Sequence, residues 1–248
     1  MNTRHWIQHF EQNTPLNDAL TWPESASPLA EVVRRALAES LAVFQLGETG
    51  GGTRLRRYAA GLAREAGWGG YPRVVDRFIA EEQSHARLLA RLVAHLGGRL
   101  RQKQWSNGLF RWVRGLAGLE FAIQMLLTAE LVAEVYYGTL FLRCTDPAVR
   151  AVAGKILRDE MQHLAFQREF LVERLARLTP AAQRLWLWQF ATVHALTAAA
   201  VAWDHRRCLR ALGVEPVEFC RRAAAARAAF ARRLERLLAT PEAQACVS

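Results

Sequence analysis

Two Glu-x-x-His pairs stand at positions where a helix buries its side chains. The first pair belongs to a nearly apolar series spaced by three or four residues: Val75, Phe78, Glu82, His85, Leu89, Leu92 and Leu96. The second belongs to a similar series: Val149, Ala153, Ile156, Glu160, His163, Gln167 and Phe170. Residues i, i+3 and i+4 share one helix face, so each pair is predicted to point into the interior. Burial without a partner would cost each group several kcal/mol, and a bound metal ion removes that cost.

Two further glutamates, Glu48 and Glu130, interrupt apolar series in the same way. Each precedes its Glu-x-x-His pair by roughly thirty residues, which is room for half a helix, a turn and another half-helix. Four carboxylates and two imidazoles on four antiparallel helices form the di-iron or di-manganese centre of helical bundles. The predicted metal ligands are therefore Glu48, Glu82, His85, Glu130, Glu160 and His163.

With these residues the chain resembles the ferritin-like di-iron carboxylate superfamily over about residues 30–178. The phrase Asp159-Glu160-Met-Gln-His163 looks like aldehyde-deformylating oxygenases, and Glu81-Glu82-Gln-Ser-His85 looks equally like rubrerythrins. The resemblance implies an all-α, ferritin-like four-helix bundle that holds two Fe ions, or Mn/Fe or Mn. It also implies that Glu82 and Glu160 bridge the two metals, that Glu48 and Glu130 are terminal ligands, and that each histidine binds one metal.

Three residues near these ligands are candidates for supporting roles. The resemblance implies that Asp159 orients a histidine ligand, and the alternative is an exposed aspartate on its helix. Tyr137 lies two turns after Glu130 and could hydrogen-bond a ligand or simply fill the core. Glu134 lies one turn after Glu130. We favour Glu134 as an edge residue paired with arginine over Glu134 as an extra metal ligand.

The predicted organisation has an irregular N-terminal arm (1–27), the bundle (28–178) and two added C-terminal helices (179–248). Ser27 and Pro28 are predicted to start the first helix, and Asp146-Pro147 the fourth. The expected helices cover residues 28–66, 72–96, 109–143, 147–178, 180–212 and 216–238, with a crossover at 99–108.

The glycines of Gly47-Glu48-Thr49-Gly50-Gly51-Gly52 are unusual within a helix, where each costs about 1 kcal/mol. The apolar series continues on both sides, so the helix is predicted to persist. Gly51 would then leave open volume beside the metals, for a substrate or oxygen. The alternative is a kink without a pocket.

Composition narrows the class of protein. The four cysteines form no Cys-x-x-Cys pair, which excludes a rubredoxin-type iron site. The most apolar stretch, 190–203, is interrupted by His194 and favours a buried helix over a membrane span. With no secretory signal evident, a cytoplasmic protein is expected. The net charge of +10 comes with no recognition motif, so nucleic-acid binding is not favoured.

Two enzymatic functions compete at this stage. The favoured one is an oxidase or oxygenase that uses O2, a small organic substrate and an external electron donor. The alternative is a peroxidase or ferroxidase that handles peroxide or iron. A non-enzymatic scaffold would leave the six polar residues buried without purpose. A second copy of the chain is a candidate binding partner. Trp186, Trp188 and Trp203 are expected to lie in the core or in an interface.

Overall fold

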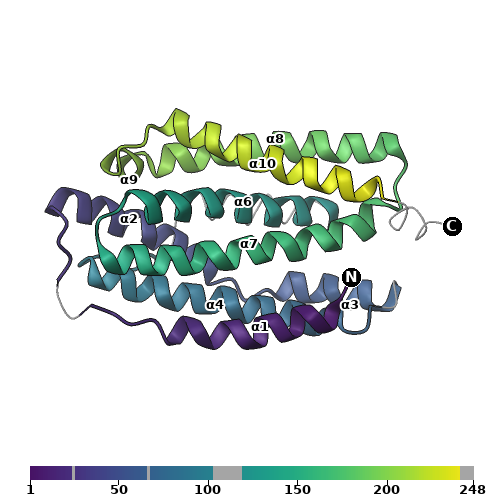
Figure 1. Ribbon diagram of the computed structural model, residues 1–248, viewed down its shortest axis with the longest axis horizontal. Coiled ribbons are helices and arrows are strands. Elements are labelled where there is room, and N and C mark those ends of the chain that lie inside the picture. The colour runs from purple at the N-terminus through teal and green to yellow at the C-terminus, as the bar shows by residue number, and fades with distance from the viewer. Residues whose placement is uncertain (24–25, 66–67, 103–118, 241–248) are drawn as a thin grey trace. The chain divides into compact units, whose positions relative to one another are not determined.

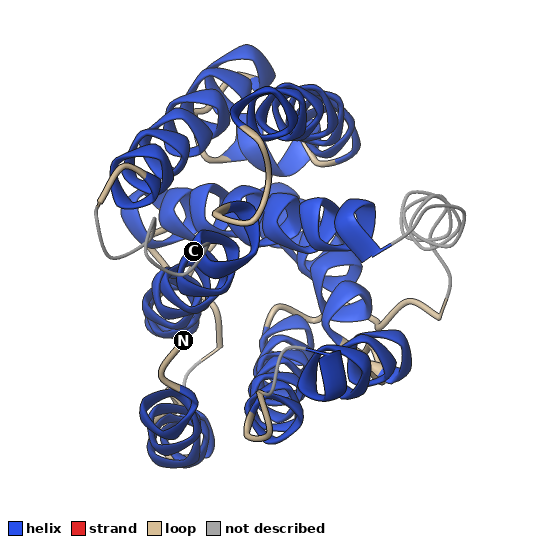
Figure 2. Ribbon diagram, turned by 90° about the vertical axis from the view of Figure 1, so that its right-hand side faces the viewer, coloured by secondary structure: helices blue, strands red, loops and turns tan. Residues whose placement is uncertain are grey.

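The structure is a computed structural model that describes residues 1–23, 26–65, 68–102 and 119–240. All regular structure in these ranges is helical (Figure 2). The chain divides into two compact units. The amino-terminal unit holds Asn2–Val113 and Leu140–Ile156; the carboxy-terminal unit holds Met1, Arg114–Thr139 and Leu157–Ser248. The predicted all-α, ferritin-like fold class is confirmed.

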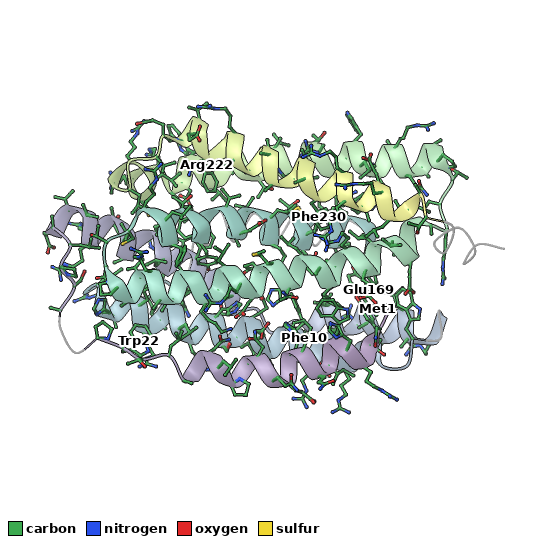
Figure 3. The ribbon with its side chains drawn as sticks, viewed as in Figure 1. Met1, Phe10, Trp22, Glu169, Arg222 and Phe230 are labelled. Carbon is green, nitrogen blue, oxygen red and sulfur yellow. The ribbon has the colours of Figure 1, made fainter. Side chains whose placement is uncertain are left out.

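In the amino-terminal unit, α4 (Tyr71–His95) packs against three other helices. These are α1 (Thr3–Asp18), α2 (Glu31–Glu48) and α3 (Thr53–Glu65), as Figure 1 shows. Each presents its apolar face to α4. Phe10 of α1, labelled in Figure 3, is one example. Its ring meets Phe78 of α4 edge to face, with ring centroids 6.1 Å apart. These contacts fix α4, which carries the first Glu-x-x-His pair.

In the carboxy-terminal unit, α8 (Pro180–Asp204) and α10 (Pro216–Leu238) lie side by side, joined through the short α9 (Arg206–Ala211) (Figure 1). Phe230 of α10 contacts Phe190 of α8, with ring centroids 6.5 Å apart. The Arg168 guanidinium carbon lies 5.8 Å from the centroid of the Phe230 ring. Phe230 is labelled in Figure 3. This aromatic cluster is the core between α8 and α10.

The helices α6 (Leu119–Arg143) and α7 (Pro147–Leu175) each have residues in both units. The prediction that Asp146 caps α7 is confirmed: its Oδ1 accepts hydrogen bonds from the amides of Ala148 and Val149, at 2.8 and 3.1 Å. The buried carboxylate also accepts from Ser27 and lies 3.1 Å from His95 Nε2. Burial alone would raise the pKa of Asp146, but these hydrogen bonds lower it below its usual range.

The amino-terminal arm differs from its prediction. Residues Thr3–Asp18 form a regular helix, not an irregular segment. The proline at position 15 lies inside this helix near its end, and it concealed the helical pattern. The predicted cap at Ser27 is also wrong, because α2 begins at Glu31 and the Ser27 hydroxyl bonds Asp146 instead.

The prediction of one helix over 28–66 is wrong. The chain leaves the helix between Glu48 and Thr53, where Gly52 has a positive φ of 63°. A side chain at Gly52 would overlap Ile79 of α4, so glycine is required there for space as well as for backbone conformation. Gly51 is exposed in this loop rather than on a core face. The prediction that Gly51 lies on the core face of a continuous helix is therefore wrong.

The other helix boundaries differ less from those predicted. The predicted helices 72–96 and 216–238 match α4 and α10 closely, while the α7 helix ends at Leu175 and not 178. The predicted helix 180–212 is interrupted at His205, between α8 and α9. Residues 103–108 of the crossover and 109–118 of the third predicted helix lie outside the described residues. Two helices, α6 and α8, are long and apolar enough to cross a membrane by length and composition.

Candidate metal centre

In the carboxy-terminal unit, Glu130 of α6 meets Glu160 and His163 of α7. The Nδ1 atom of His163 lies 3.2 Å from Glu130 Oε2 and 3.5 Å from Glu160 Oε2. One ligand atom from each residue lies within 4.8 Å of the others. All three side chains are buried. The helical spacing of Glu160 and His163 brings both to the face that meets Glu130, as the sequence predicts.

Two buried carboxylates lie side by side in this set. Burial, and then the charge and hydrogen bond of Glu130, raise the pKa of Glu160 well above its usual range, although His163 opposes the shift. A carboxylate pair of this kind stays charged only when a cation neutralises it. The electrostatics of this set therefore fit a bound metal ion.

In the amino-terminal unit, a second set joins Glu48 to the first Glu-x-x-His pair. One ligand atom each from Glu48, Glu82 and His85 lies within 4.8 Å of the others. His85 Nδ1 lies 3.7 Å from Glu82 Oε1, and the imidazole is fully buried. Glu48 is the last residue of α2, directly before the glycine loop. The break in the helix therefore leaves this glutamate within reach of α4.

Each set offers two carboxylates and one imidazole. Carboxylate oxygens suit hard iron and manganese ions, and a neutral imidazole adds one nitrogen ligand. The same combination of three ligands recurs on two pairs of helices, α2 with α4 and α6 with α7. This repeat agrees with the twofold pattern of the sequence, and the donor chemistry fits iron.

The structure also shows the surroundings of the three residues that were candidates for supporting roles. Asp159 is buried, so its alternative as an exposed aspartate is wrong. Tyr137 is fully buried, and its ring meets Tyr136 edge to face at 5.5 Å. Glu134 is half-buried and belongs to neither ligand set. Burial raises the pKa of the Glu134 carboxyl.

A hydrogen-bond network beneath the first pair was missed by the sequence analysis. Asn13 of α1 donates to Glu81 Oε1 at 2.7 Å and accepts from Lys155 Nζ at 3.3 Å. Asn17 donates to the Ser84 hydroxyl, which itself donates to the Glu81 carbonyl at 2.8 Å. We call Asn13 and Asn17 the α1 clamp, because they hold the turn of α4 that carries the metal ligands. The spacing of Trp6, Phe10, Asn13 and Asn17 on one helix face was the signal that could have identified it.

A buried amide on α7 is the second feature that was not singled out. Gln167 lies one turn after His163 and two turns after Glu160, so it shares the ligand face of the helix. Its side chain is only 5% exposed. Neither its Oε1 nor its Nε2 has a hydrogen-bond partner among the residues that the structure describes. A buried amide without partners costs about 1–3 kcal/mol, which a polar ligand would recover.

Comparison with protein families gives a match to the model of p-aminobenzoate N-oxygenase AurF over residues 73–241. Comparison with curated proteins and with solved structures gives no match. The matched region is more than half of the chain and includes Glu82, His85, Glu130, Glu160 and His163. The predicted superfamily is thus confirmed, in a branch other than the two that the motifs resemble most. The carboxylate and histidine sets fit the dinuclear metal site of such enzymes, and the chain belongs to the AurF family of ferritin-like di-iron N-oxygenases.

Proposed function

We propose that this enzyme oxygenates the nitrogen of a small aromatic amine. The observation that carries the proposal is the family match, which spans five of the six candidate ligands. The stoichiometry of the first oxygenation is as follows. An arylamine, O2, two electrons and two protons give an arylhydroxylamine and one water. The electrons come from an external reductant, and further rounds would give nitroso and nitro products.

We propose that two irons are held by the two sets, one containing Glu48, Glu82 and His85, the other Glu130, Glu160 and His163. Bound there, the irons supply the redox chemistry that activates O2. The protein supplies the metal ligands and sets which ligand atoms carry protons. His163 binds a metal through a ring nitrogen that carries no proton, so metal binding at Nδ1 requires the tautomer with Nδ1 unprotonated and replaces the contact with Glu130 Oε2.

Gln167 is the proposed contact for the polar group of the substrate. Its amide offers a donor and an acceptor, lies on the ligand face of α7 and lacks described protein partners. An aromatic amine that carries a carboxylate or another polar group could satisfy it. Tyr137 and Asp159, both buried, are the proposed supporting residues for the reaction.

The test is product analysis with the iron-loaded chain of 248 residues. Purified enzyme is supplied with p-aminobenzoate or aniline, a chemical reductant and O2 labelled with ¹⁸O. Expected products are the hydroxylamine, nitroso or nitro compounds, with the label on nitrogen. Rapid oxidation of Fe²⁺ or turnover of peroxide, with no labelled product from any arylamine, would instead support the ferroxidase or peroxidase alternative.

A further inference from the structure

The helix α10 carries a concentration of positive charge that the chain itself does not neutralise. After its first turn it holds six arginines and one acidic residue, Glu235. Glu218, in the first turn, pairs with two of the arginines, at 2.8 Å from Arg221 and 2.9 Å from Arg222. The other four form no ion pair with any residue that the structure describes: Arg227, Arg232, Arg233 and Arg236.

The outer face of α10 combines two of these arginines with small side chains. Ala225, Ala229, Arg232 and Arg236 follow one another at steps of four, three and four residues, so they line one face of the helix. All four are exposed. A second protein can therefore approach the helix closely at the alanines, while the guanidinium groups reach past it.

A fifth unpaired arginine, Arg168 of α7, extends this charge beyond α10. Its guanidinium carbon lies 5.8 Å from the ring centroid of Phe230, which is one turn before Arg233. Burial, and then the charge of Arg233, lower the pKa of Arg168. The two guanidinium groups repel each other, and a carboxylate from outside the chain would relieve that repulsion. We call the five unpaired arginines the basic face: Arg168, Arg227, Arg232, Arg233 and Arg236.

The basic face is connected to one of the two ligand sets through α7. Arg168 lies five residues after the ligand His163, a rise of about 7.5 Å along the helix. Phe230 of α10 is thus linked to His163 by the Arg168 side chain and by about one and a half turns of α7. Electron transfer slows steeply with distance, so a carrier bound at the basic face has a short route to this ligand set.

We propose that the basic face is the docking site of the electron donor, an acidic protein that carries one electron at a time. The inference rests on the proposed function, because that reaction consumes two electrons from outside the chain. Two docking events supply them. Each reduced carrier loses one electron, and two ferric ions become ferrous before O2 reacts.

Charge complementarity and size both favour this occupant. Opposite charges steer two proteins together and raise the rate of their encounter. Encounters between redox proteins are transient and bury less than about 1,200 Å², so one helix face and its flank are enough. Nucleic acid fits less well, since both aromatic residues of α10, Phe219 and Phe230, are buried and offer the bases nothing to stack on.

The test uses a reduced plant-type [2Fe–2S] ferredoxin, which is an acidic one-electron carrier, and the iron-loaded chain in its ferric state. Anaerobic stopped-flow absorbance gives the second-order rate constant of reduction, without arylamine or O2. The rate constant should fall steeply with added salt, because the Debye length shrinks from about 30 Å at 0.01 M to about 8 Å at 0.15 M. At low salt, Arg232→Glu/Arg233→Glu should lower it about tenfold or more.

The matched control is Arg57→Glu/Arg64→Glu, which replaces two exposed arginines of α3. Each replacement removes one positive charge and adds one negative charge, so both double variants lower the net charge by four, from +10 to +6. The control should keep a rate constant close to that of the parent chain. Dithionite, a small reductant that needs no docking surface, should reduce the two double variants equally fast.

Calorimetric titration with oxidised ferredoxin is a second measurement, which requires no electron transfer. The Kd should rise about tenfold or more in Arg232→Glu/Arg233→Glu and stay close to the parent value in the control. The neutral variant Arg232→Gln/Arg233→Gln should give an intermediate Kd. It keeps the test available if the charge-reversed variant fails to fold.

Several results would overturn the proposal. Equal slowing in the two charge-reversed variants would show that the carrier responds only to net charge. No binding of ferredoxin by the parent chain, or an unchanged rate in Arg232→Glu/Arg233→Glu, would exclude the docking site. Binding of an oligonucleotide in place of ferredoxin, lost in the same variant, would assign the basic face to nucleic acid.

Failure of the proposed function is a separate result. Reduction by ferredoxin that depends on the basic face, with no labelled product from any arylamine, would leave the docking site in place and reject the N-oxygenase reaction.

Discussion

His163 Nδ1 lies 3.2 Å from Glu130 Oε2, although the two residues are 33 positions apart in the chain. Two ligands about 2.1 Å from one ion and at right angles to each other are about 3 Å apart. The pair is thus already at the separation that a shared metal requires. Little rearrangement is needed when the hydrogen-bonding proton is replaced by a metal ion.

Replacing this histidine should remove one metal. His163→Ala is expected to lower the iron content from about two to about one ion per chain, because its set loses the only nitrogen ligand. Iron is measured by plasma emission spectroscopy after anaerobic loading. The control is Glu134→Gln, a half-buried neighbour outside both sets, which should keep two irons. An unchanged iron content in His163→Ala would exclude this set as a metal site.

Asp159 should affect metal affinity more than metal number. The buried carboxylate precedes Glu160, and residues that orient metal ligands typically contribute 10–100-fold in affinity. Asp159→Asn is expected to bind two irons with an affinity lowered about tenfold or more, as measured by competition with a chelator. The exposed neighbour Gln162 provides the control Gln162→Ala. Equal affinities in the two variants would contradict the orienting role.

Gln167 should act on substrate binding alone. Gln167→Leu removes both amide atoms at nearly constant volume, so the iron content and fold should be retained. The KM for a polar arylamine such as p-aminobenzoate should rise about tenfold or more, while the KM for aniline should change little. Steady-state kinetics with both substrates provide the comparison. Equal changes for the two amines would show that Gln167 contacts no polar group of the substrate.

The glycine loop predicts opposite results at adjacent positions. Gly52→Ala should destabilise the protein by about 1–3 kcal/mol, because φ is 63° and the new methyl group would overlap Ile79. Gly51→Ala should have little effect, since nothing lies within 4 Å of the added Cβ. Chemical denaturation of the metal-free chains gives both values. Similar losses at the two positions would contradict the loop geometry.

His194 should make the free energy of unfolding depend on pH. Burial, and then the charge of Arg227, lower the pKa of His194 from 6.5 to about 4. Between these two pH values the unfolded chain binds a proton that the folded chain does not, so stability falls as the pH falls. The contribution is about 1.4 kcal/mol per pH unit, or about 3 kcal/mol over the whole interval.

His194→Leu should remove this part of the pH dependence. The difference in unfolding free energy between parent and variant is measured for metal-free protein at pH 7, 5.5 and 4. The parent should lose stability relative to the variant at each step towards lower pH. A constant difference across the series would mean that His194 is protonated equally in the folded and unfolded states.

The ligand pattern was predictable because helical periodicity is a local property. Each Glu-x-x-His pair falls on one helix face as soon as a helix is assumed, which holds for Glu82 with His85 and for Glu160 with His163. The break at Gly52 was not predictable from the same periodicity, since the apolar series continues through it. At the break, Gly52 lies so close to Ile79 of another helix that an added Cβ would overlap it, and this close approach is a tertiary constraint.

Long-range partners were beyond the sequence for a similar reason. Asn13 bonds Glu81, which lies 68 positions away, and no local pattern marks that pairing. Gln167 belonged to a recognised series, but its lack of described partners is a property of the folded structure.

The α1 clamp also constrains when the protein matures. Lys155 and Asn13 are 142 positions apart, so their hydrogen bond cannot form until most of the chain has been synthesised. Contacts of such separation carry a large loop-closure entropy and form late in folding. The turn with Glu82 and His85 therefore gains its fixed geometry late, after α7 has emerged. We therefore expect the first Glu-x-x-His pair to bind metal tightly only after α7 has been synthesised.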